Sequence, residues 1–346
     1  MKNYLKYGGM TFTIVVLCLC SCTGNKGVMT PTSSGYPYEL IVVVEPGVWN
    51  RPAGRTLYEA LISDIAGLPQ SEPAFKVMYT APNDYTSILK LVRNIIIVDI
   101  QPDKYTQAKF TQAKDVYATP QIIVNIQAPN EEEFQKFVEE NKEGLITFFT
   151  HAEMNRQIMI LEKKHNDFIS QKVKEMFDCE IWLPGELNSS KTDENFFWAS
   201  TNKATADQNF LIYAYPYRDR NTFTKEYFVH VRDSVMKINM PGAPKNSYMI
   251  TDSAMTVVKP LNWHGNYVFE ARGLWRMKGD FMGGPFVSHS RVDTKNNRII
   301  TAEVFIYSPD KSKGNLLRRT EASLYTLKLP EERNKEEQES NTIPGK

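Results

Sequence analysis

The sequence predicts an α+β protein of two packed α/β halves, with mixed or antiparallel sheets and a long central helix. Three observations support this fold class. Strand-like and helix-like segments alternate over residues 38–128, apolar residues recur at helical spacing over 131–177, and strand-like segments dominate 178–330. The chain has 346 residues, 42% of them hydrophobic, which is long enough for about two domains with filled cores.

The first half, residues 38–177, opens on an apolar strand at 40–44, and such a strand indicates a sheet covered on both faces. A helix that starts at Pro52 is expected to stop at Gly67 and Pro69. The remaining expected elements are a short helix at 84–92 and strands at 75–80, 94–100 and 121–126, whereas the polar segment 102–118 is ambiguous.

The longest predicted helix starts after Asn130, a residue type that caps helix N-termini. Glu131, Glu132 and Glu133 fill its first turn, where the helix dipole favours negative charge. Apolar residues then continue at spacings of three and four as far as Phe177. The pattern predicts one helix or a kinked pair of about 45 residues, with a break near Gly144.

The second half, residues 178–330, is expected to be mainly an antiparallel sheet, with a hairpin turn at 293–297. The residues from 331 to 346 have almost no apolar side chains and are predicted to be a disordered tail. The expected helices are 222–238 and 315–327, and the expected strands are 179–183, 195–201, 209–217, 247–250, 255–260, 267–278, 285–293 and 298–307.

The N-terminus has the pattern of a secretory signal, with Lys2 and Lys6 followed by an apolar run that is too short to span a bilayer. The sequence Leu19-Cys20-Ser21-Cys22 resembles the lipobox of bacterial lipoproteins. The resemblance implies that residues 1–21 are removed and that Cys22 receives acyl chains such as palmitate, which anchor the protein to a membrane. The alternative is an ordinary cleaved signal in which the cysteines occur by chance.

The residues after Cys22 indicate how the protein is displayed. Residues 22–37 are rich in Gly, Ser, Thr and Pro, and we interpret them as the lipidated cysteine and a flexible tether. Position 23 is Thr and not Asp, and no acidic cluster follows. By resemblance to Gram-negative lipoproteins, these features predict anchoring in the outer membrane, on its periplasmic face.

Charge and cysteine content exclude some functions. The chain has 41 Lys and Arg against 40 Asp and Glu, and this balance argues against nucleic acid as a partner. After removal of residues 1–21 and acylation of Cys22, Cys179 is the one free thiol, so no intrachain disulfide can form. Because Cys179 stands in an apolar stretch without a neighbouring histidine, we interpret it as a buried structural residue.

Two further segments carry a resemblance. Residues 273–288, which read GLWRMKGDFMGGPFVS, and the run Arg319-Thr320-Glu321-Ala322 resemble an uncharacterised domain-of-unknown-function family of Gram-negative bacterial lipoproteins. The likeness extends over nearly all of the mature chain and implies no activity.

Motifs for catalysis, metals or cofactors do not assign a reaction. The sequence contains neither H-E-x-x-H nor G-x-S-x-G nor a phosphate loop. The pattern S-x-x-K starts at Ser87, Ser234 and Ser308 without its companion motifs. We therefore assign no catalytic residue, metal or cofactor, and predict a membrane-anchored envelope factor for non-enzymatic binding or assembly, with an envelope protein or glycan as candidate partner.

The alternative function is an envelope hydrolase that acts on cell-wall or glycan substrate through residues distant in sequence. A pocket that brings a histidine and a carboxylate, or two carboxylates, into hydrogen-bonding distance would favour this alternative.

Three tyrosines form the first candidate binding site. Tyr213, Tyr215 and Tyr217 share one face of a predicted strand, and their rings could stack on sugar rings. Packing beneath a helix explains the same pattern.

The charged face of the C-terminal strands is the second candidate. Period-2 alternation places Glu270, Arg272 and Arg276 on the polar side of one strand, and depending on register it adds His289, Arg291 and Glu303. Two arginines four residues apart could bind an anionic ligand or partner. A solvated face with weak ion pairs is the alternative, and burial of this face under a helix would eliminate the site.

Overall fold

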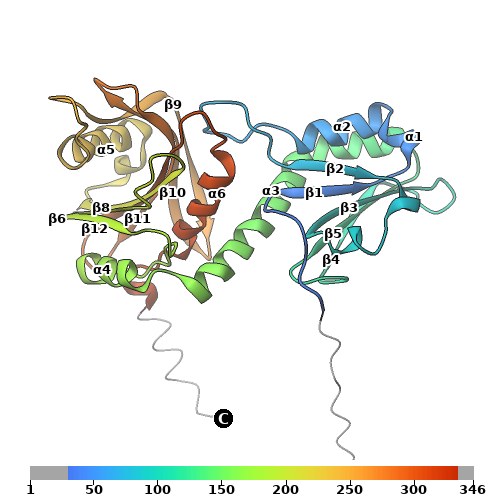
Figure 1. The fold of residues 1–346 in the computed structure, drawn as a ribbon, viewed down its shortest axis with the longest axis horizontal. Helices are drawn as coiled ribbons and strands as arrows, with labels where there is room; N and C mark the ends of the chain where they lie inside the picture. Colours follow the sequence, from blue (N-terminus) through green and yellow to red (C-terminus); the bar gives the residue numbers. More distant parts are fainter. Residues whose placement is uncertain (1–29, 334–346) are drawn as a thin grey trace, which may run out of the picture.

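The computed structural model describes residues 30–333 and places them in two halves side by side, each built on its own sheet (Figure 1). Cys22 and the tail after residue 333 lie outside the described residues. Helices and strands occur in both halves, so the predicted α+β class is confirmed. Among residues 30–333, no helix combines the length and apolar character needed to cross a bilayer.

The first half holds a five-stranded sheet in the order β2-β1-β3-β5-β4. Its strands are β1 (Glu39–Val43), β2 (Lys76–Thr80), β3 (Asn94–Ile100), β4 (Lys109–Lys114) and β5 (Ile122–Ala128). All neighbours are parallel except β4, which runs antiparallel to β5. Parallel strands need both faces covered. Accordingly, β1 is buried along its whole length.

Helices cover one face of this sheet, with α2 (Pro52–Leu61) and α3 (Glu131–Lys164) packed on each other, while the short α1 (Pro46–Trp49) precedes α2. Phe134, Val138, Leu145 and Phe149 of α3 join the core between helices and sheet. The other face carries a smaller cluster around Ile41 and Ile95, covered by the segment that contains the 3₁₀ turns η1 (Pro82–Asp84) and η2 (Leu89–Leu91).

The second half holds a fully antiparallel seven-stranded sheet in the order β6-β7-β8-β12-β11-β10-β9. On one face lies α5 (Lys225–Asn239), preceded by η3 (Arg220–Phe223), and on the other lie α4 (Asp167–Phe177), α6 (Gly314–Glu321) and η4 (Ala322–Thr326). The strands are β6 (Ser189–Asp193), β7 (Phe196–Ser200), β8 (Asp207–Pro216), β9 (Tyr248–Trp263), β10 (Asn266–Lys278), β11 (Gly283–Asp293) and β12 (Arg298–Tyr307).

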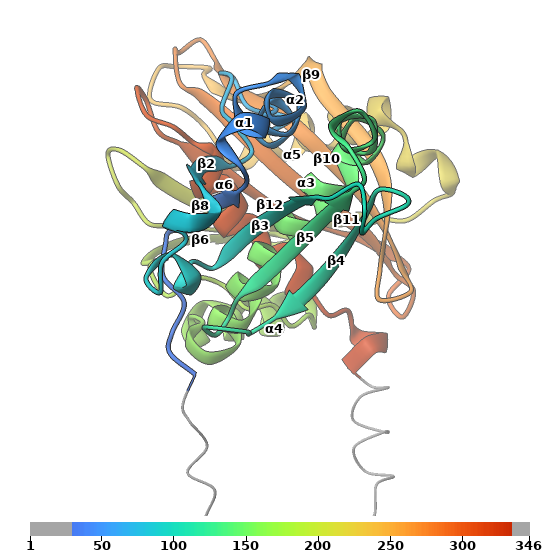
Figure 2. The same ribbon diagram turned by 90° about the vertical axis from the view of Figure 1, so that its right-hand side faces the viewer.

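Helix α3 connects the two halves. It begins against the first sheet and ends against η4 in the second half, where Met154 and Leu161 pack with Ala322 (Figures 1 and 2). The helix does not break at Gly144, as the sequence suggested, but at His165 and Asn166. Asn166 restarts the chain as α4 because its side chain accepts a hydrogen bond from the amide of Ile169.

Several predicted elements differ in the structure. The helix expected at 84–92 is replaced by η1 and η2, the strand expected at 179–183 forms a single bridge, and β4 and β6 were not predicted. The strands expected at 247–250 and 255–260 are one strand, β9, with an irregularity opposite Arg272. A bulge of this kind interrupts the side-chain alternation, which makes one strand resemble two.

The boundaries of the two halves, the tether and the tail also differ from the predicted ones. Helix α4 packs with the second sheet through Ile169, Val173 and Phe177, so by packing the second half begins near 166 and not at 178. The predicted tether is already ordered at Ser34, whose amide donates to Leu91 O (2.8 Å). In the predicted tail, Glu332 accepts hydrogen bonds from Arg291 and from the amide of Leu329, so at least this part of it is packed.

Candidate functional site

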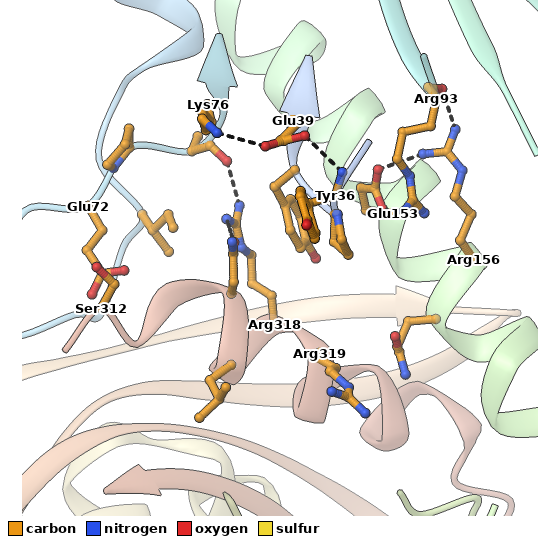
Figure 3. A pocket seen from close by; sticks show the side chains of 18 of the residues that line it. Tyr36, Glu39, Glu72, Lys76, Arg93, Glu153, Arg156, Ser312, Arg318 and Arg319 are labelled. Atoms are coloured by element: carbon orange, nitrogen blue, oxygen red, sulfur yellow. Dashed lines mark hydrogen bonds and ion pairs between the residues drawn. The ribbon is translucent and has the colours of Figure 1, made fainter. Parts of the chain in front are cut away.

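A pocket of about 550 Å³ lies where the two halves meet (Figure 3). The first half contributes residues from the start of β1, the loop before β2 and one face of α3, and the second half contributes α6. Charged side chains with more cations than carboxylates line it: Lys76, Arg93, Arg156, Arg318 and Arg319 against Glu39, Glu72 and Glu153. Apolar and aromatic groups form the rest of the wall: Tyr36, Pro37, Tyr38, Ile65, Pro73, Ala74, Ile160 and Leu316.

Two arginines share one buried carboxylate on the α3 side of the pocket. Oε1 of Glu153 accepts a hydrogen bond from Arg156 Nη1 (2.7 Å), and its Oε2 lies 3.0 Å from Arg93 Nη2. Asn94 Nδ2 also donates to Glu153 (2.7 Å). Burial lowers the pKa of Arg156, although the Glu153 charge opposes this shift. This cluster therefore places a surplus positive charge in the wall.

Arg318 on α6 has a different environment. Its Nη1 donates to Ala74 O and its Nη2 to Asn315 Oδ1, both at 2.8 Å, and its guanidinium carbon lies 3.4 Å from the ring centre of Tyr38. None of the ion pairs within residues 30–333 involves Arg318, although the residue is only 5% exposed. Its buried Nε has no hydrogen-bond partner there. Burial lowers the pKa of Arg318.

The other two carboxylates of the pocket already have donors. Glu39 accepts from Lys76 Nζ and from the amide of Tyr36, each at 2.9 Å. Glu72 accepts from the backbone amides of Lys313 (2.7 Å) and Gly314 (2.8 Å), where α6 begins. Glu72 thus ties the first half to α6, because a carboxylate at a helix start satisfies amides that have no partner within the helix.

The predicted charged face of the C-terminal sheet is not a surface. Arg272 is bound by Glu321 of α6 (Nη2 to Oε1, 2.6 Å), and Arg291 donates to Leu327 O (3.0 Å). Glu270 and His289 are buried beside Tyr325. Because α6 and η4 cover these side chains, the prediction of an anion site at Glu270, Arg272, His289 and Arg291 is wrong.

The two remaining members of that predicted site lie elsewhere. Glu303 points to the opposite face of the sheet, where it is fully buried against Arg232 of α5. The register explains this placement, since Glu303 pairs with Ser288, whose neighbour His289 faces the other way. Arg276 is exposed near the end of β10, away from the residues that bind Arg272.

Tyr213 and Tyr215 do share one face of β8, as predicted, and Tyr217 directly follows the strand, but α5 and η3 cover this face. Tyr213 is buried, and its ring stacks on that of Tyr215 with 6.0 Å between ring centres. Tyr215 lies near Tyr227 of α5, and Tyr217 lies near Phe223 of η3. Burial raises the pKa of Tyr215 to about 12. Packing beneath a helix therefore accounts for this pattern, and Tyr213 is not available to a sugar.

Two histidines lie near carboxylates, the arrangement that would favour a hydrolase. His289 Nε2 is 3.5 Å from Glu270 Oε2, but both side chains are buried. His165 Nε2 is 3.1 Å from Asp167 Oδ1 in a shallow pocket, and its Nδ1 is 3.0 Å from Leu161 O. The two ring nitrogens of His165 thus contact a backbone carbonyl and the exposed carboxylate of Asp167.

The nearby Ser170 does not complete a catalytic arrangement, because within the described part of the chain its buried hydroxyl has no hydrogen-bond partner. Cys179 is also buried, and burial raises the pKa of its thiol to about 12. Across residues 30–333, no group of three histidine, cysteine or acidic side chains is placed to hold a metal ion.

Sequence reasoning missed the pocket between the halves because its residues come from distant segments. The adjacent arginines at 318 and 319 were the local signal, but charged pairs of this kind are common on protein surfaces.

Comparison with known proteins gives two family matches. Residues 33–162 match the model of a domain of unknown function (DUF8532), and residues 166–326 match that of another domain of unknown function (DUF4837). No curated protein matches the chain. A crystal structure from Bacteroides thetaiotaomicron at 1.50 Å resolution has 15% identity over 44% of each chain, with a TM-score of 0.19. The expected likeness to uncharacterised domains is thus confirmed.

Proposed function

We propose that this protein is a lipid-anchored, non-enzymatic binding protein of the bacterial envelope and that its ligand site is the pocket between the two halves. The observation that carries the proposal is the pocket itself, because it is concave, has the size of a small-molecule site and takes its walls from both halves. The charged and apolar groups that line it could orient a ligand.

The proposed location in the envelope is supported by the lipobox-like sequence that ends at Cys22. We propose that the protein is held on the periplasmic face of the outer membrane. Near the start of the described residues, Ser34 is hydrogen-bonded to the first half and stands two positions before the pocket residue Tyr36. The pocket is therefore close along the chain to the proposed lipid anchor at Cys22, so a ligand that leaves the membrane could reach it.

Replacing Cys22 by Ser should release the protein from membranes into the soluble fraction, because the acyl chains proposed at this thiol supply the anchor. Membrane fractionation measures the release, and labelling with a radioactive fatty acid measures the acylation. A Cys20→Ser variant is the matched control and should stay membrane-bound and labelled. Label in the Cys22→Ser protein would contradict the assignment.

Replacing Ser312 by Trp should block the pocket, because Ser312 is an exposed lining residue and an indole there would enter the ligand space. Protein isolated from envelopes of its own host would be denatured, and released compounds would be identified by mass spectrometry. The variant should release about tenfold less of a compound that the natural protein carries. Ser253→Trp, at an exposed position on β9, is the control, and equal release from both variants would argue against the pocket.

A further inference from the structure

We infer that the ligand of the pocket between the halves is an amphipathic carboxylate, with its anionic head at Arg318 and its apolar body toward Tyr36 and Ile160. This inference rests on the proposed function, since it specifies the ligand class of the same site.

The charge balance of the pocket favours an anion. Every carboxylate in the wall is already engaged: Glu39 by Lys76, Glu72 by two backbone amides, and Glu153 by Arg93 and Arg156. Arg319 is paired with Glu186 outside the pocket. Of the five cations that line the pocket, Arg318 is the one without a carboxylate partner among residues 30–333. A buried unpaired charge is unfavourable, and an anionic ligand would remove this penalty.

Arg318 is also held in position to receive such a head group. Its two terminal nitrogens donate to Ala74 O and Asn315 Oδ1, and the Tyr38 ring lies against the guanidinium plane. These contacts leave the buried Nε–H without an acceptor. Figure 3 shows Arg318 rising from α6 toward the loop that precedes β2, so the side chain crosses from one half to the other. A fixed guanidinium loses little freedom when it binds a carboxylate.

The apolar part of the ligand is indicated by two side chains at the pocket that are unusually exposed for their type. Tyr36 is 76% exposed and Ile160 is 53% exposed, whereas Arg318 is buried. Leu316 and Ile65 line the space as well. An apolar chain that leaves Arg318 and covers these groups would remove their surface from water. If each non-hydrogen group of the ligand occupies about 30 Å³, as a water molecule does, the pocket volume of about 550 Å³ suits a carboxylate with a medium-length chain.

The test uses three probes that separate charge from apolar surface: dodecanoate, dodecanol and acetate. Each is titrated into the full chain below its aggregation concentration, and binding is followed by calorimetry and by the shift in melting temperature. Dodecanoate should bind at least about tenfold more tightly than dodecanol, because only dodecanoate gives Arg318 a charged acceptor. Acetate, which lacks the apolar body, should bind too weakly to measure.

Variants at two positions, Arg318 and Ile160, assign the contacts. Arg318→Gln should reduce dodecanoate affinity to that of dodecanol, and Arg318→Lys should retain part of the difference. Because changes at Arg318 could also disturb the contact with Ala74, Ile160→Glu provides an independent test at the exposed mouth. It should weaken dodecanoate at least about tenfold by charge repulsion and loss of apolar contact. Ile238→Glu, at a still more exposed isoleucine on α5, is the control and should bind like the natural protein.

The outcomes separate this inference from the proposed function. Equal binding of dodecanoate and dodecanol, both weakened by Ile160→Glu, would show a pocket that binds ligands without preference for an anionic head, and would overturn the inference alone. Absence of dodecanoate binding at millimolar concentration would also overturn it, while the release experiment with Ser312→Trp still decides the proposed function. Equal loss in Ile160→Glu and Ile238→Glu would place binding outside the pocket.

Discussion

Replacing Glu303 by Ala should lower the free energy of unfolding by about 3–5 kcal/mol, because Arg232 then remains buried and charged without its carboxylate. In the folded protein, Arg232 Nε and Nη2 donate to the two oxygens of Glu303 at 2.9 and 2.6 Å, and both side chains have no exposed surface. Thr251 and the Phe286 ring enclose the guanidinium further. Urea denaturation of both proteins measures the difference.

The double variant Arg232→Met with Glu303→Leu distinguishes the lost ion pair from a general packing defect. It should recover most of the stability, because apolar side chains of similar size remove the buried charge. Lys174→Ala, which breaks an exposed pair with Glu180, should cost less than about 1 kcal/mol. A loss of less than about 1 kcal/mol in Glu303→Ala itself would contradict the buried pair.

Acid should destabilise the protein through Glu270, and the variant Glu270→Gln should abolish that part of the response. Burial by itself would raise the pKa of Glu270, but the neighbouring His289, whose Nε2 lies 3.5 Å from Glu270 Oε2, and the charges of Arg272 and Lys259 lower it to about 2. The unfolded chain therefore binds a proton at a higher pH than the folded one. The stabilisation is complete above the unfolded pKa near 4.5 and is lost as the pH falls toward 2.

The shift corresponds to about 3 kcal/mol between these limits, since one pKa unit is about 1.4 kcal/mol. The measurement is the free energy of unfolding from pH 6 to pH 2 for the natural protein and for Glu270→Gln. Other acids, such as Asp178 and Glu180, contribute equally to both curves, so the difference isolates Glu270. Parallel curves across this range would contradict the prediction.

Local sequence patterns correctly predicted elements that are stabilised mainly by contacts between residues close in the sequence, such as helix caps and tight turns. Asn130 accepts a hydrogen bond from the amide of Glu133, as expected of a helix cap. The hairpin turn before Arg298 also forms, with Asn297 in the left-handed region at φ 49°. The 3₁₀ turns η1 and η2 and the strand β4 were harder to predict, because neighbouring elements stabilise them more than their own sequence does.

The candidate site was not predictable in the same way. Alternation along β10 correctly places Glu270 and Arg272 on one face, but it does not reveal which element covers that face. Glu321, the partner of Arg272, lies 49 positions away. The link from Glu72 to the start of α6 joins residues 242 positions apart. Contacts between residues so far apart in the sequence depend on tertiary packing, which hydrophobic periodicity and secondary-structure propensity do not describe.

Helix α3 makes the two matched segments depend on each other for the burial of apolar surface. The matched segments meet at 163–165, immediately at the end of this helix. Its 34 residues extend about 50 Å, and Met154 and Leu161, which belong to the first matched segment, pack against Ala322 of the second. Transfer of either segment to another protein would expose this apolar seam, so a recombined domain would require a new cover or compensating polar substitutions at the end of α3.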